Sequence, residues 1–118
     1  MHNFRELKIW QRAMDFVVRI YNATSNFPKE EQYGLTSQLR KSAVSVPSNI
    51  SEGAGRGTNK QFGHFLEISM GSINEAQTQI ELASRLKYIG NEEYEFLADE
   101  AIQIYKMILG FYNGLRKD

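Results

Sequence analysis

Apolar residues recur every three or four positions along four segments of the chain, the spacing of one face of an α-helix. In residues 6–25 the stripe consists of Leu7, Trp10, Met14, Val17, Tyr21 and Thr24. In the segment from about residue 32 to residue 53 or slightly beyond, it consists of Leu35, Leu39, Ala43, Val46, Ile50 and Ala54. These two patterns predict the first two helices.

Two more stripes follow in the second half of the chain. In residues 60–89 the apolar face consists of Phe62, Phe65, Ser69, Ile73, Ala76, Ile80, Ala83 and Leu86. The last stripe has strict heptad spacing and consists of Tyr94, Leu97, Ala101, Ile104, Ile108, Phe111 and Leu115. These patterns predict a long third helix and a fourth helix that runs to the end of the chain.

Proline and glycine mark the predicted boundaries. Pro28 ends the first helix, and the next helix is expected to start after it, with residues 29–31 in or near its first turn. Pro47 has no turn-forming cluster around it, so we expect a bent but continuous second helix. Thr58 or Asn59 is expected to cap the third helix at its start, and Gly90 is expected to follow its end.

Four helices joined by short connections must pack antiparallel to their neighbours. The chain has 118 residues, close to the commonest size of a domain. The sequence therefore predicts an all-α protein with one domain, residues 1–118, folded as an antiparallel up-down-up-down four-helix bundle.

Charge is balanced overall but not along the chain. Fourteen basic residues match 14 acidic ones, yet residues 1–60 contain nine Lys or Arg and five Asp or Glu, whereas residues 61–118 contain five and nine. A pI near 6.7 argues against a dedicated nucleic-acid binder, whose affinity comes largely from neutralising phosphates. The N-terminus does not resemble a signal peptide and no apolar run could span a bilayer, so we expect a cytoplasmic protein with no membrane contact.

The residue types that carry catalysis or metal binding are sparse. The chain has no cysteine, and its two histidines, His2 and His64, have no ligand-like partner at helical spacing. The glycine-rich segment of residues 53–60 follows a predicted helix and has neither a P-loop nor a Rossmann pattern. We therefore expect no catalytic residues, no metal and no cofactor, and no enzymatic activity.

Polar residues form an ordered stripe on the second helix. They are Gln38, Ser42, Ser45, Asn49, Glu52 and Arg56, spaced by alternating steps of four and three. One interpretation is structural: small residues allow close helix approach, Asn49 bonds into the bend at Pro47, and Arg56 pairs with Glu52.

Two functional interpretations of the same stripe stay open. In the first, a basic edge binds phosphates of RNA or DNA, with Gln38, Ser45 and Asn49 as hydrogen-bond partners; the edge consists of Arg40, Lys41, Arg56 and Lys60. In the second, the stripe faces another subunit, with aromatic anchors left over from the core, namely Tyr33, Phe62, Tyr88 and Tyr112.

The chain resembles, over nearly its whole length, a family of four-helix bundle proteins first noticed as reading frames inside intervening sequences of bacterial 23S ribosomal RNA genes. The resemblance rests on four groups of residues: Phe4, Leu7, Trp10 and Ala13; Tyr21 and Thr24 leading into FPKEEQYGL; the segment QLRKSAVSVPSNISEG, which starts at Gln38; and Gly71, Ser72, Glu75 and Thr78. A relative of that fold is the accessory variability determinant of diversity-generating retroelements, a pentameric barrel that works with a reverse transcriptase and RNA. That relative is strongly basic, and this chain is not.

The resemblance implies a four-helix bundle, a homopentamer, a nucleic-acid partner and no catalysis. Together with the residue patterns, it leaves two hypotheses. The first is a homo-oligomer that associates with RNA or DNA through the basic edge of the second helix. The alternative is an oligomeric scaffold or adaptor for a protein partner, without nucleic-acid binding.

Overall fold

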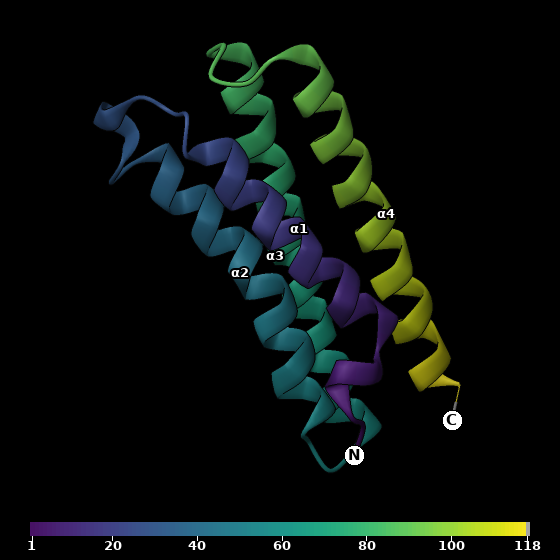
Figure 1. Cartoon of the computed structure of the whole chain (residues 1–118). Helices are drawn as coiled ribbons and strands as arrows, with labels where there is room; N and C mark the ends of the chain where they lie inside the picture. Colours follow the sequence, from purple (N-terminus) through teal and green to yellow (C-terminus); the bar gives the residue numbers. More distant parts are fainter. Residues whose placement is uncertain (118) are drawn as a thin grey trace.

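The computed structural model describes residues 1–117, and all regular secondary structure in them is helical (Figure 1). Its four helices are α1 (Lys8–Thr24), α2 (Leu35–Ala54), α3 (Asn59–Arg85) and α4 (Asn91–Arg116). Two single 3-10 turns, η1 (Phe4–Glu6) and η2 (Lys29–Glu31), precede α1 and α2. No strand occurs in residues 1–117, so the predicted all-α class is confirmed.

The helices pack as a four-helix bundle in which each helix contacts the next one along the chain and α4 closes against α1. Consequently α1 lies diagonally across from α3, and α2 diagonally across from α4. Figure 1 shows α2 and α4 on opposite sides and both termini at one end of an elongated molecule, whose principal extents are 46 × 23 × 20 Å.

The core forms from the predicted stripes of α2 and α4 and most of the stripe of α3. The stripe that predicted the first helix lies only partly in the core. Met14 and Tyr21 are exposed, Thr24 is buried, and the half-buried members pack against the core, namely Leu7, Trp10 and Val17. The side chains that α1 buries are Ile9, Ala13, Phe16, Ile20 and Thr24. α1 therefore has two overlapping apolar stripes about one residue apart. One packs in the core, and the other lies at the edge of the core and reaches the surface at Met14 and Tyr21.

α2 runs without interruption through Pro47, as predicted. The hydroxyl of Ser69 on α3 is fully buried and donates a hydrogen bond to the carbonyl of Val46, the residue before the proline (2.9 Å). The segment of residues 29–31 forms η2, a turn separate from α2, where we expected the start of the helix. The side chain of Glu31 instead caps α2, because its Oε1 accepts a hydrogen bond from the amide of Leu35 (3.0 Å).

α3 begins at its predicted cap and ends earlier than predicted. Thr58 Oγ1 accepts a hydrogen bond from the amide of Gln61 (3.1 Å). At the other end, Lys87 has a positive φ of 63°, and the amide of Tyr88 donates to the carbonyl of Ala83 (2.9 Å). These contacts form a Schellman motif with lysine in the left-handed position. Gly90, expected at the end of α3, is the residue that precedes α4.

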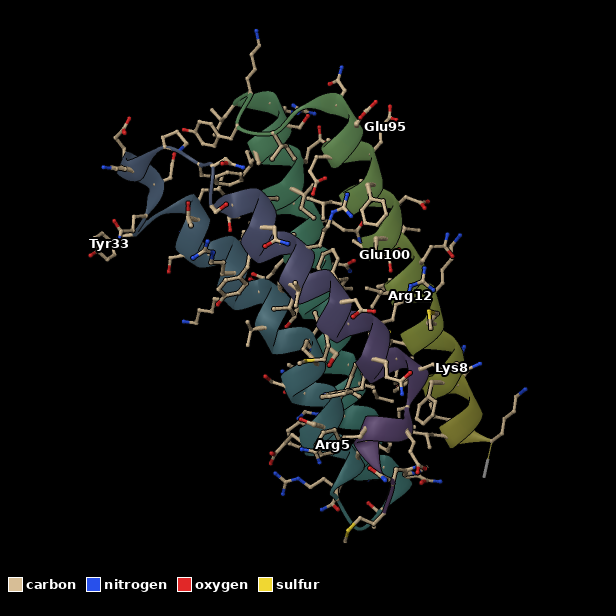
Figure 2. All side chains as sticks on the ribbon, in the orientation of Figure 1. Arg5, Lys8, Arg12, Tyr33, Glu95 and Glu100 are labelled. Carbon is tan, nitrogen blue, oxygen red and sulfur yellow. The ribbon has the colours of Figure 1, made fainter. Side chains whose placement is uncertain are left out.

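Two arginine–glutamate pairs join α1 to α4. The guanidinium of Arg19 donates two hydrogen bonds to Glu93 (3.1 and 3.0 Å), and Arg12 binds Glu100 in the same two-pronged way. Figure 2 shows Arg12 and Glu100 pointing toward each other from the two helices. Planar arginine pairs of this kind fix geometry as well as charge, so they set the register of α1 against α4.

Candidate functional site

The middle of the polar stripe on α2 lies against α3. Ser42 is buried, and the hydroxyls of Ser45 and Ser72 are hydrogen-bonded to each other at 2.8 Å. The amide nitrogen of Asn49 donates to the carbonyl and the hydroxyl of Ser45 (2.8 and 2.9 Å), one turn from Pro47. Small polar side chains therefore fill this seam between two closely packed helices and satisfy each other within the protomer.

The ends of the stripe remain open to solvent. Gln38 and Glu52 are exposed, and the guanidinium of Arg56 pairs with Glu52 one turn away and lies over the ring of Phe65 (4.8 Å to its centre). A shallow hollow follows the seam, lined by Gln38, Lys41, Ser42, Ser45, Ser72, Glu75 and Gln79. Its floor includes the Oε1 atom of Gln79, which is buried and accepts no hydrogen bond from the described residues.

The four basic residues of the predicted edge form two separate pairs. Arg40 and Lys41 lie near the start of α2, whereas Arg56 and Lys60 flank the connection to α3. The rise of an α-helix places Lys41 and Arg56 about 22 Å apart along the axis. Arg56 is already paired with Glu52, so the structure does not bring the four charges together on one surface.

Aromatic side chains accompany the first of these pairs. Arg40 donates hydrogen bonds to Thr24 Oγ1 (2.7 Å) and the carbonyl of Tyr21 (3.3 Å), and its guanidinium lies 4.4 Å from the centre of the Tyr21 ring. Lys41 is exposed and makes no ion pair within the described residues. Tyr33 is 90% exposed and lines the same hollow as these residues. Figure 2 shows Tyr33 pointing away from the bundle.

The aromatic residues predicted as surface anchors have different environments. Tyr33 is a free surface residue, but Phe62 is buried in the core, so its assignment as an anchor is wrong. The hydroxyl of Tyr88 donates to Glu31 Oε2 (2.9 Å), and this bond, with burial, raises the pKa of the tyrosine. Tyr112 packs over Gly63 of α3.

An apolar groove between α1 and α2 did not emerge from the sequence. It is lined by Phe4, Arg5, Trp10, Met14, Val17, Val44, Pro47, Ser48 and Ser51. Met14 is 39% exposed and Val44 37% exposed, although both are large apolar side chains at the middle of the molecule. Its trace in the sequence is the stripe that contains Trp10, Met14 and Val17, which predicts a helix but not a groove. We call this surface the α1/α2 groove.

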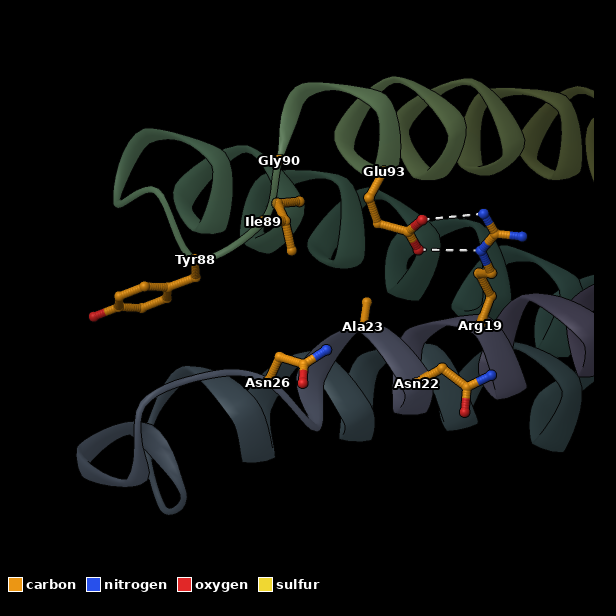
Figure 3. Close-up of a pocket in the computed structure, with 8 residues that line it drawn as sticks. All are labelled: Arg19, Asn22, Ala23, Asn26, Tyr88, Ile89, Gly90 and Glu93. Atoms are coloured by element: carbon orange, nitrogen blue, oxygen red, sulfur yellow. Dashed lines mark hydrogen bonds and ion pairs between the residues drawn. The ribbon is translucent and has the colours of Figure 1, made fainter.

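A more polar hollow lies at the end of the bundle where α1 ends and α4 begins (Figure 3). Its charged groups are Arg19 and Glu93, which Figure 3 shows joined by two hydrogen bonds. The bonds to Glu93 raise the pKa of Arg19. Since each charge is already neutralised by the other, neither Arg19 nor Glu93 is free to bind a charged ligand.

Other kinds of site have little support in residues 1–117. No three side chains of the metal-binding types come together there, and none of the four helices combines the length and the apolar character needed to cross a membrane. The two histidines contact aromatic rings, His2 those of Phe62 and Phe111 and His64 that of Phe65.

Comparison with known proteins gives a family and solved structures with a similar fold. A sequence model described as 23S rRNA-intervening sequence protein matches residues 5–110. No curated protein matches the chain. The fold is similar to the 1.70 Å crystal structure of a protein with unknown function from the S23 ribosomal protein family of Bacteroides thetaiotaomicron VPI-5482, at 25% identity and a TM-score of 0.79, covering 88% of this chain and 97% of that one.

Proposed function

Because the chain belongs to the 23S rRNA-intervening sequence protein family and leaves an apolar groove between α1 and α2 uncovered, we propose that it is a non-enzymatic, homo-oligomeric cytoplasmic protein. The resemblance to pentameric relatives favours a homopentamer. In this proposal the assembled particle acts as a scaffold.

The exposed second stripe of α1 carries this proposal. Met14 is exposed and Val17 half-buried in the groove beside Val44, and their open apolar surface would cost solvation free energy in a lone protomer. Apolar grooves with aromatic walls, here Trp10, are typical of contacts between proteins. A polar small-molecule site would instead need several convergent polar groups.

Solution mass tests the proposal directly. Light scattering after size-exclusion chromatography, at several protein concentrations, is expected to give a multiple of the 13.6 kDa protomer, with five protomers for the pentamer. A mass of one protomer at high micromolar concentration would contradict it.

Nucleic-acid association is a second candidate, favoured by the cluster at the start of α2. An exposed Tyr33, a fixed Arg40 and an unpaired Lys41 combine a stacking surface with positive charge, as single-strand binding surfaces do. The family name refers to ribosomal RNA, and the neighbour's family is named for a ribosomal protein. If RNA and DNA are not bound, the proposal reduces to a scaffold for a protein partner.

Fluorescence anisotropy with labelled single-stranded and hairpin RNA and single-stranded DNA at low salt tests this candidate. Binding is expected to weaken steeply with salt, and Lys41→Ala and Tyr33→Ala are each expected to weaken it severalfold. Lys106→Ala removes an exposed lysine from α4 and serves as the matched control. Equal affinities of the control and the two variants would reject the cluster as the site.

A further inference from the structure

Gln79 of α3 carries a polar atom that the fold leaves without a partner. Its Oε1 atom is buried and accepts no hydrogen bond within residues 1–117. A buried oxygen without a hydrogen bond costs free energy, and native proteins leave few of them. Gln79 lines the hollow between α2 and α3 that also contains Lys41 and Glu75, which we call the seam hollow. A donor from a bound molecule would satisfy this oxygen.

Two opposite charges line the seam hollow without pairing. Lys41 comes from α2 and Glu75 from α3; both are exposed, and neither takes part in an ion pair among residues 1–117. The arginines that join α1 to α4, by contrast, are paired with glutamates. An unpaired cation on one wall and an unpaired anion on the other suit a ligand that carries both charges itself.

The packing of α2 against α3 brings these two charges to the same level. The two helices are consecutive and antiparallel, and the hydrogen bond of 2.8 Å between the hydroxyls of Ser45 and Ser72 sets their register. Residues before Ser45 on α2 therefore lie level with residues after Ser72 on α3. Lys41 and Glu75, four residues before and three residues after this bond, face the hollow from opposite sides at one height.

The next level of the seam hollow contains two carboxamides. Gln38 precedes Lys41 by three residues and Gln79 follows Glu75 by four, which places both about 5 Å further along the helix axes. Each carboxamide provides N–H donors and a carbonyl acceptor. A ligand that matches both levels has two opposite charges at one end and a carboxamide about one helical turn away.

We propose that the seam hollow binds a free α-amino acid with a carboxamide side chain, glutamine being the one of matching length. Its carboxylate lies against Lys41 and its ammonium group against Glu75. Its side-chain amide donates to Gln79 Oε1 and accepts from Gln38. The hollow has a volume of about 300 Å³, at the lower end of the range for small-molecule sites. No aromatic residue lines it, so it lacks the stacking surface that nucleobases use.

This site goes beyond the proposed assembly and does not depend on it. Titration of the ¹⁵N-labelled protein with L-glutamine, followed by NMR of the backbone amides, tests it. Saturable shifts are expected in residues 38–45 and 72–79, with a Kd below about 1 mM. The absence of saturable binding up to about 10 mM would overturn the proposal.

Three analogues test the role of each group of the ligand. N-acetylglutamine lacks the ammonium charge, glutaminamide lacks the carboxylate, and norleucine lacks the carboxamide. Each is expected to bind about tenfold more weakly than glutamine or not at all, because each leaves one group of the hollow without its partner. Equal affinities of glutamine and the three analogues would overturn the proposal.

Charge variants of the protein test the two walls. Glu75→Gln and Lys41→Gln are each expected to weaken glutamine binding about tenfold. Glu67→Gln removes an exposed carboxylate of α3 outside the hollow and is the matched control. Equal affinities of Glu75→Gln and Glu67→Gln would reject the site. Tyr33→Ala, which should weaken nucleic-acid binding, is expected to leave glutamine binding unchanged, so the two sites are tested separately.

Gln79→Leu separates a ligand-binding role of this side chain from a structural one. It removes the buried, unpaired oxygen and keeps a side chain of similar size, so the ligand-free variant should have a higher Tm than ligand-free wild type. The same variant should lose glutamine binding and keep the helical circular dichroism spectrum. A lower Tm, or glutamine binding equal to that of wild type, would overturn the role of Gln79 in the site.

Discussion

At Gly53, the absence of a side chain lets the end of α2 approach the start of α3. A Cβ atom at this position would lie 2.8 Å from the side chains of Phe62 and Phe65, and 3.2 Å from the Phe62 carbonyl. Because Phe62 is fixed in the core, the added methyl group has no room. We expect Gly53→Ala to lower the free energy of unfolding by about 1–3 kcal/mol, the usual cost of overpacking, as measured by urea unfolding.

Gly55 provides the matched control for this substitution. It lies two residues further on, and the nearest atom to its added Cβ is the Glu52 carbonyl oxygen at 3.6 Å, an ordinary contact. Gly55→Ala is therefore expected to leave stability nearly unchanged. Equal losses from the two alanines would show that flexibility, not close approach, explains the glycine at residue 53.

Glu31 joins three parts of the fold through one carboxylate. It accepts hydrogen bonds from the Leu35 amide and from the Tyr88 hydroxyl, and these bonds, in that order, lower the pKa of Glu31 below its ordinary value of 4.5. A carboxyl group with a lowered pKa in the folded state stabilises the protein fully above its unfolded pKa, and this stabilisation is lost as the pH falls through the folded pKa.

Replacing this carboxylate should therefore have a pH-dependent effect. We expect Glu31→Gln to lower the urea midpoint at pH 7. This difference from wild type should begin to shrink as the pH falls below the ordinary pKa of about 4.5, where the unfolded chain binds a proton, and should be lost once the pH is also below the lowered pKa of the folded state. Glu30→Gln, at the exposed neighbouring position, should change the midpoint little at any pH. A Glu31→Gln difference that is constant from pH 7 to pH 3 would contradict the assignment.

At the level of the helices, the end of α3 depends on a residue in an unfavourable conformation. Lys87 occupies the left-handed region, where an L-residue with a side chain pays about 1–2 kcal/mol. Glycine avoids this cost but loses more entropy on folding, so Lys87→Gly should raise stability by up to about 1 kcal/mol. Thermal unfolding should show a higher Tm. Ser84→Gly, within the last turn of α3, should instead lower it.

Periodicity predicted the helices well but could not choose between two stripes of one helix. The stripes of α2 and α4 are isolated apolar faces, and their burial follows directly. In α1, however, Phe16 and Val17 belong to adjacent stripes, and only the position of the neighbouring helices decides that Phe16 enters the core. The early end of α3 was hidden for a related reason, since lysine is not the residue expected in a left-handed turn.

The polar stripe of α2 shows the same limit on predicting a site. Its regular spacing was visible in the sequence, as was the pairing of Arg56 with Glu52. The partner of its middle section, Ser72, lies on α3, 27 residues from Ser45 along the chain. A pattern on one helix indicates that a face is polar. Whether solvent, another subunit or a neighbouring helix covers that face depends on how the helices pack.

At the scale of the whole molecule, the neutral total charge conceals two different surfaces. The half of the chain that forms α1 and α2 is basic and lines the apolar groove, whereas the half that forms α3 and α4 is acidic. Because the charges lie beside apolar residues, salt should weaken only part of the attraction between two copies of the protein. Apolar burial does not depend on screening, so the proposed assembly should persist at ionic strengths where the Debye length is a few Å.

Assembly through these surfaces also predicts how the protein unfolds. A partner that binds the folded protomer and not the unfolded chain stabilises the fold by mass action, so the Tm of wild type should rise with protein concentration. A Met14→Glu variant, which places a charge in the α1/α2 groove, retains the core of the bundle but cannot assemble, so its Tm should stay constant and match that of highly diluted wild type. Calorimetry and circular dichroism over a hundredfold range of concentration measure both. The mass of the same samples should show one protomer at the lowest concentration and several at the highest. If the wild-type Tm nevertheless stays constant, association stabilises the folded state no more than the unfolded one. That result would contradict a contact between folded surfaces.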